Sequence, residues 1–182
     1  YGLTVHNVVG LKLLTIEGEE LVLGGKALDS PGYDLLALMS GSEGMLGVII
    51  EITVKLLPVP PERRVLLGAF HDLDSAAETV SQIIAGGLVP AGLEMMDRLA
   101  VQAAEDFVHA GYPREAEAIL LCEVDGTTAE VDASVALVRR VFNEFGAFAV
   151  RLATDPEEQA NLWRGRKAAF PAVGRLAPDY YC

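Results

Sequence analysis

The sequence is poor in cysteine and histidine, and each scarcity excludes a class of protein. Two cysteines, Cys122 and Cys182, are too few for a disulfide framework. Because Cys122 lies inside an apolar run, we expect it to be a small core residue. The lack of a disulfide framework fits a protein of the reducing cytoplasm best. The three histidines, His6, His71 and His109, show neither H-x-x-H nor H-E-x-x-H spacing, so we expect no metal site.

Positive charge and long hydrophobic runs are also scarce. Fourteen Lys and Arg residues face 26 Asp and Glu residues, and a net charge of −12 argues against a nucleic-acid partner. No run of about 18 uncharged apolar residues is present, which predicts no membrane span, and no signal peptide is recognisable. Hydrophobic residues are abundant and make up 51% of the chain, which predicts a globular protein with a large buried core. Since the chain runs from Tyr1 to Cys182 without an initiating methionine, we expect a piece of a longer protein.

The first third of the chain has patterns typical of strands. Residues 8–24 are two apolar runs joined by a polar turn, which predicts a β-hairpin. A loop over 26–31 and a short helix from Asp34 to Leu38 should follow, and then a long strand over 46–57. Prolines end this strand, and the segment VPPERR at 59–64 predicts a domain boundary.

The remaining two thirds alternate between strand and helix patterns. Strands are predicted over 65–70, 91–96, 116–124 and 148–153. Helices should begin at Asp74, after the cap Asp97, at Thr128, and at Asp155 with Pro156. If the helix after Asp97 is left out, the order is βαββαβ, the ferredoxin-like arrangement. The fold class is therefore predicted to be α+β, with an antiparallel sheet covered by helices on one face.

A glycine-dense turn at 41–47 comes directly before the long apolar strand. Its glycines can make a tight turn, because glycine takes positive φ at no steric cost. They can also let the backbone approach a ligand and turn N–H groups toward a phosphate. Spacing alone favours the structural interpretation, since the segment is not G-x-G-x-x-G and no P-loop lysine follows.

Two groups of charged residues also have a structural and a functional interpretation. Asp97 is expected to cap a helix with Glu94 at a pocket rim or in solvent, which is favoured over a catalytic carboxylate pair. The basic residues at 164–167 are expected on a solvated helix face. In the functional interpretation Arg166, one turn from Trp163, is a planar fork for a substrate carboxylate.

Taken together, the chain resembles FAD-linked oxidases of the vanillyl-alcohol-oxidase type. The resemblance rests on residues 1–25, 30–58, 90–97 and 162–182, which occur in the family's order. The pattern G-S-E-G-x-L-G-[VI]-I at 41–49 is specific to this flavin superfamily. The segment WRGRKAAF at 163–170 narrows the resemblance toward members that oxidise glycolate and D-lactate.

This resemblance implies two domains and a divided active site. Residues 1–61 would be the C-terminal part of a PCMH-type FAD-binding domain, and residues 62–182 the first part of the substrate, or cap, domain. FAD would be the cofactor, and Arg166 would hold the substrate carboxylate. Main-chain contacts to FAD would come from Glu43, Gly44, Met45, Leu46, Gly47, Val48 and Ile49. No catalytic residue would lie in this chain, because the family's general base and metal ligands follow its last residue.

The implied activity is oxidation of a small D-2-hydroxy acid, glycolate or D-lactate, by hydride transfer to FAD in the complete protein. Companion flavin and iron–sulfur subunits would accept the electrons, and attachment to a membrane would come only through such partners. Two alternatives stay open. One is a non-redox FAD enzyme of the alkyl-dihydroxyacetone-phosphate synthase kind, and the other is an inactive ferredoxin-like packing module that forms homo-oligomers through exposed strands.

Overall fold

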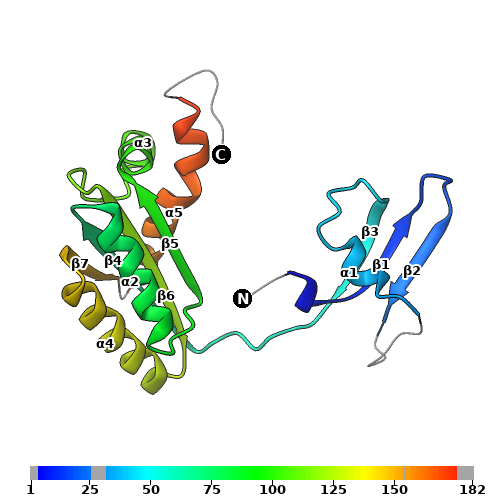
Figure 1. Ribbon diagram of the computed structural model, residues 1–182, viewed down its shortest axis with the longest axis horizontal. Helices are drawn as coiled ribbons and strands as arrows, with labels where there is room; N and C mark the ends of the chain where they lie inside the picture. The colour runs from blue at the N-terminus through cyan, green and yellow to red at the C-terminus, as the bar shows by residue number, and fades with distance from the viewer. Residues whose placement is uncertain (1–3, 26–31, 154, 176–182) are drawn as a thin grey trace. The chain divides into compact units, whose positions relative to one another are not determined.

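The computed structural model describes residues 4–25, 32–153 and 155–175, and the chain divides into two compact units, residues 1–59 and 60–182 (Figure 1). The loop predicted over 26–31 lies outside the described residues. None of the described helices is long and apolar enough to cross a bilayer. The assignment of the chain to two domains, 1–61 and 62–182, stays a prediction.

The first unit is a small three-stranded antiparallel sheet. Its elements are η1 (Thr4–His6), β1 (Val8–Leu14), β2 (Glu20–Gly24), α1 (Leu35–Met39) and β3 (Val48–Val54), with strand order β2-β1-β3. The hairpin is confirmed, since β1 pairs with β2 in antiparallel register. Asp34 caps α1 as predicted by accepting a hydrogen bond of 3.0 Å from the Ala37 amide. The long strand is shorter than predicted because its pairing with β1 ends at Val48 and Val54.

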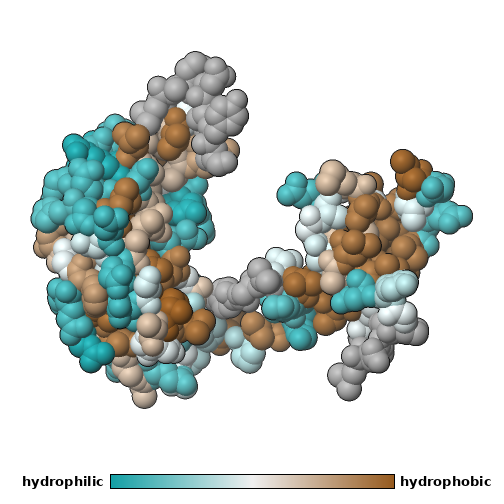
Figure 2. Space-filling model, viewed as in Figure 1, coloured by the Kyte–Doolittle hydropathy of each residue, from teal (hydrophilic) through white to brown (hydrophobic). Residues whose placement is uncertain are grey.

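Few side chains form the core of this unit. Val8, Leu11, Leu13 and Met39 are buried, with Leu23 and Leu36 packed against them. All seven residues of β3 are exposed, and Figure 2 shows hydrophobic residues gathered on the visible face of this unit.

The second unit is a four-stranded antiparallel sheet with four helices. Its elements are β4 (Glu62–Phe70), α2 (Leu73–Ala85), β5 (Gly92–Asp97), α3 (Arg98–Val108), β6 (Ala118–Gly126), α4 (Thr128–Glu144), β7 (Ala147–Ala153) and α5 (Pro156–Val173). The strand order β5-β6-β4-β7 is that of the ferredoxin-like arrangement, as predicted. Asp97 caps α3 as expected, and its side chain accepts a hydrogen bond of 2.8 Å from the Ala100 amide.

The prediction that helices cover only one face of this sheet was wrong. Side chains from α2 and α4 pack with Leu66 and Phe70 in one core. Side chains from α3 and α5 pack with Val65 and Leu67 in a second core. Adjacent residues of β4, such as Val65 and Leu66, are both fully buried, which requires cover on both faces. The unbroken apolar run in β4 indicates a strand that is covered on both faces. The predicted βαββαβ order did not include α3, which is one of the two helices on the second face.

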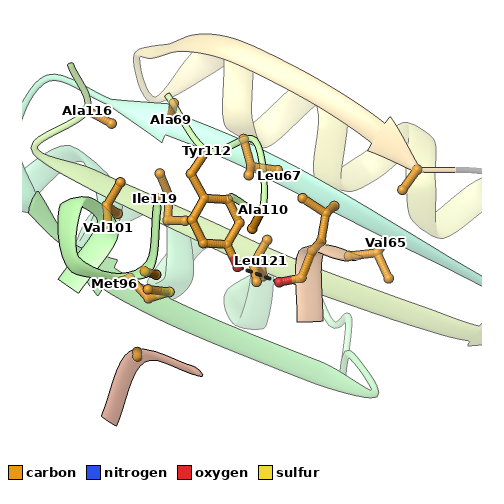
Figure 3. Close-up of a cluster of buried hydrophobic side chains, with 14 residues drawn as sticks. Val65, Leu67, Ala69, Met96, Val101, Ala110, Tyr112, Ala116, Ile119 and Leu121 are labelled. Carbon is orange, nitrogen blue, oxygen red and sulfur yellow. Dashed lines mark hydrogen bonds between the residues drawn. The ribbon is translucent and has the colours of Figure 1, made fainter. Parts of the chain in front are cut away.

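Helix α5 lies unusually close to the loop after α3. Tyr112 of that loop is buried among the core side chains shown in Figure 3, and its hydroxyl donates a hydrogen bond to the Leu162 carbonyl of α5. Burial raises the pKa of this hydroxyl. The Tyr112 amide in turn donates to the buried Glu105 carboxylate over 2.9 Å. The hydrogen bond to the Leu162 carbonyl therefore anchors the turn of α5 that carries Trp163 and Arg166.

Candidate functional site

The glycine segment 41–47 forms an irregular turn between α1 and β3. Its backbone is stabilised by hydrogen bonds from the Ser42 amide to the Met39 carbonyl (3.2 Å) and from the Met45 amide to the Ser42 carbonyl (2.9 Å). Glu43 has φ of 50° and Gly44 has φ of 80°, both in the left-handed region. A non-glycine residue in that region is uncommon, so this turn has a specific shape imposed by its surroundings.

Two glycines of the segment are required for different reasons. At Gly47 an added Cβ would lie 2.9 Å from the Leu14 carbonyl oxygen, so packing against β1 excludes any side chain. At Gly44 an added Cβ would meet no atom within 4 Å, so only the positive φ favours glycine there. The structural interpretation thus accounts for Gly47, while the backbone at Gly44 lies open to a ligand.

The surroundings of this turn fit a large cofactor with polar and apolar parts. The Ser42 hydroxyl oxygen is buried and has no hydrogen-bond partner within the described ranges. The amides of Glu43 and Gly44 donate no backbone hydrogen bond to any residue that the structure describes. Met45 is 84% exposed and Val48 is 62% exposed, which leaves apolar surface beside these polar groups. Leu46 and Ile49 are also exposed.

Arg166 of α5 forms an ion pair with Glu94 of β5. The Arg166 Nε and Nη2 atoms each lie 3.1 Å from the same carboxylate oxygen, Glu94 Oε2. Both side chains are partly exposed, 38% for Arg166 and 41% for Glu94. Among the described residues nothing contacts Nη1 as a hydrogen-bond acceptor, so the terminal Nη1–Nη2 edge can bind a second carboxylate.

A second contact joins the same helix to the same edge of the sheet. Trp163 Nε1 donates a hydrogen bond of 2.6 Å to Glu123 Oε2 on β6. The Trp163 ring covers Gly92, where an added Cβ would lie 3.2 Å from two ring carbons. Trp163 and Arg166 are one helical turn apart, and Gly92 and Glu94 are two residues apart on β5, so the two contacts lie side by side.

Sequence reasoning singled out Arg166 but missed its partner. Glu94 was expected at a pocket rim or in solvent; it is 41% exposed, and its contact with the guanidinium was not anticipated. No local signal pairs the two residues, because they are 72 positions apart in the sequence.

The side chains of Cys122 and His71 pack against neighbouring residues. Cys122 is fully buried as predicted, and burial raises the pKa of its thiol to about 12. The His71 ring stacks on Phe148 with centroids 4.3 Å apart. Within the described part of the chain, no group of three or more His, Cys, Asp and Glu residues is arranged to hold a metal ion.

The sequence of this chain is similar to those of several known proteins. The family described as FAD linked oxidases, C-terminal domain, matches residues 59–182. Glycolate oxidase subunit GlcD of Escherichia coli (strain K12) is 58% identical over 182 residues, which are 100% of this chain and 36% of that protein. GlcD of Bacillus subtilis (strain 168) is 38% identical over 179 residues, 98% of this chain and 38% of that protein. D-lactate dehydrogenase of Anaerostipes hadrus is 34% identical over 181 residues, 95% of this chain and 38% of that protein. The chain therefore spans little more than a third of the length of these relatives.

Solved structures with low sequence identity share the fold. An alkyldihydroxyacetonephosphate synthase superposes with a TM-score of 0.66 at 19% identity, covering 94% of this chain and 32% of the synthase. A p-cresol methylhydroxylase with substrate bound gives a TM-score of 0.65 at 16% identity, covering 93% of this chain and 40% of the hydroxylase. These neighbours confirm the predicted fold class. The matches in sequence and fold together show that the chain belongs to the FAD-linked oxidases, and that residues 59–182 belong to their C-terminal domain.

Proposed function

We propose that this chain is part of an FAD-dependent enzyme that oxidises a small D-2-hydroxy acid, glycolate or D-lactate. The observation that carries the proposal is the 58% identity, over all 182 residues, with a protein named as a glycolate oxidase subunit. A relative named as a D-lactate dehydrogenase, 34% identical, supports the same class of substrate. The synthase alternative is not favoured, because that neighbour is 19% identical and supports the fold alone.

Arg166 is the residue of this chain that would bind the substrate. Its guanidinium is charged at every physiological pH and planar, and its terminal edge can receive a carboxylate with two parallel hydrogen bonds. Binding the carboxylate in this way would fix the adjacent carbon, which carries the hydroxyl group and the hydrogen to be transferred. Such orientation lowers the barrier by converting a loose encounter into a defined geometry.

The turn and strand start at residues 43–49 would contact FAD, mainly through main-chain atoms. When bound, FAD supplies the hydride acceptor that amino-acid side chains do not provide. The buried Ser42 hydroxyl and the Glu43 and Gly44 amides would give the cofactor hydrogen bonds that the described residues leave unmade. Residues 1–61 would accordingly belong to the FAD-binding domain and residues 62–182 to the cap domain.

The proposed reaction also needs a general base and an electron acceptor, and both would lie outside this chain. A general base must take the hydroxyl proton, and we place it in the part of the protein that these 182 residues do not include. The relatives at 58% and 38% identity are named as subunits, which supports companion subunits that accept the electrons. We propose flavin and iron–sulfur subunits for this role, in a cytoplasmic complex.

Replacement of Arg166 tests the proposal in the complete protein with FAD bound. Arg166→Met should lower kcat/KM for glycolate or D-lactate roughly 10- to 100-fold, the loss expected for hydrogen bonds between charged groups. Lys167→Met is the matched control, because Lys167 is an exposed cation at the next position of α5. Equal activity of the two variants would contradict the role of Arg166. If the unmodified protein turns over neither acid with an artificial electron acceptor, the proposed reaction is wrong.

A further inference from the structure

We propose that Glu94 is the positioning residue for Arg166. It holds the guanidinium by its Nε–Nη2 edge and so presents the terminal Nη1–Nη2 edge to the substrate carboxylate. The proposal rests on the substrate-binding role proposed for Arg166.

The geometry of the ion pair leaves a binding edge open. Glu94 Oε2 accepts a hydrogen bond of 3.1 Å from Nε and also lies 3.1 Å from Nη2, so the carboxylate lies along the side of the guanidinium rather than at its end. A guanidinium offers two parallel N–H groups on its terminal Nη1–Nη2 edge as well as on its Nε–Nη2 edge, so a second carboxylate can still bind at the end. The observed contact therefore fixes the arginine without filling the edge that a substrate would use.

The energetics of the pair also favour orientation over stability. The partners of this ion pair are 38% and 41% exposed, and ion pairs that solvent reaches contribute about 0–1 kcal/mol to folding. A free arginine side chain on a helix surface has roughly 2 kcal/mol of rotamer entropy, which a fixed partner removes before the substrate arrives. The main effect of Glu94 is thus to limit the positions of the guanidinium.

Glu94 can do this because its own strand is fixed to α5 nearby. Trp163 covers Gly92 and donates a hydrogen bond to Glu123, so two contacts join α5 to strands β5 and β6 beside the ion pair. The hydrogen bond from the Tyr112 hydroxyl to the Leu162 carbonyl holds the same turn of α5. Arg166 and Glu94 therefore meet between two elements whose spacing is already set.

The test compares three variants in the complete protein with FAD bound. Glu94→Ala removes the acceptor, Glu94→Gln keeps an acceptor oxygen without the charge, and Glu117→Ala removes a different exposed ion pair, that of Glu117 with Arg98. Calorimetric titration with acetate measures carboxylate binding, and acetamide is the neutral counterpart. Steady-state kinetics with the hydroxy acid provide the second measurement.

Glu94→Ala should weaken acetate binding and lower kcat/KM by about tenfold, the effect of one charge-assisted hydrogen bond, with acetamide binding unchanged. Glu94→Gln should recover most of this loss, and Glu117→Ala should show none. If Glu94→Ala behaves like Glu117→Ala, or if both Glu94 variants bind acetate more tightly, the positioning role is overturned. Arg166→Met separates the two proposals: if it too leaves acetate binding and kcat/KM unchanged, the substrate-binding role of Arg166 has failed, and if it alone loses them, only the role of Glu94 has failed.

Discussion

A Cβ atom placed on Gly165 would lie 2.5 Å from the hydroxyl oxygen of Tyr112. The same atom would lie 2.6 Å from the Ala110 Cβ, so both the helix and the loop would have to move. This contact sets the distance between α5 and the loop after α3, and with it the position of the helix that carries Arg166.

Gly165→Ala should therefore destabilise the protein by about 1–3 kcal/mol, the usual cost of overpacking a filled core. The alanine itself favours the helix, so a loss of stability can come only from the crowded contact. Urea denaturation measures the change, with Lys167→Ala as the control at an exposed position of the same helix. Unchanged stability of Gly165→Ala would show that the helix can move away without cost.

The role of the glycine turn can be tested with a matched pair of substitutions. Gly44 and Gly18 both have φ of 80°, and at neither would an added Cβ meet an atom within 4 Å. Alanine should therefore cost about 1–2 kcal/mol of stability at each position, the strain of a left-handed residue. FAD affinity of the complete protein, measured by titration of the apoprotein, should fall more with Gly44→Ala than with Gly18→Ala, because Gly18 lies in the hairpin turn and only Gly44 would contact the cofactor. Equal affinity of the two variants would contradict a cofactor contact at Gly44.

Much of the second unit could be predicted from local signals. The cap at Asp97 and the helix from Thr128 are where the sequence placed them, because capping residues and apolar periodicity act over a few residues. Helix α2 begins at Leu73 with Asp72 as its cap, one residue before the start expected at Asp74. The error was one of boundary and left the fold unaffected.

The partners within the candidate site could not be predicted in the same way. Glu94 and Arg166 are 72 residues apart, and their contact depends on how α5 packs across the β5–β6 edge. Neither residue carries a local pattern that specifies the other. Local sequence therefore identified an arginine suited to a carboxylate, and only the packing showed what holds it.

The buried thiol of Cys122 predicts a specific pH dependence of stability. Its pKa is raised from 9.0 to about 12 because burial disfavours the thiolate. Between these values the unfolded chain loses this proton and the folded chain keeps it, so unfolding becomes more favourable as the pH rises. Below pH 9 both states are protonated and the effect is absent.

Comparison with Cys122→Ala isolates this contribution from that of other titrating groups. Between pH 7 and pH 10 the unmodified protein should lose about 1 kcal/mol more unfolding free energy than the variant, as linkage requires for one group with a raised pKa. Urea unfolding at the two pH values measures it. Parallel pH profiles would mean that the thiol is accessible to water in the folded state.

The small core of the first unit has a consequence for how a cofactor would be retained. Four hydrophobic side chains are buried among the described residues of that unit, so these residues by themselves bury little apolar area. The glycine turn belongs to this same unit. A ligand that binds only the folded form adds free energy according to its concentration and affinity, which matters most where the protein alone contributes least. Release of the cofactor and local unfolding of these residues would then be linked equilibria, and a lower concentration of free cofactor would favour both.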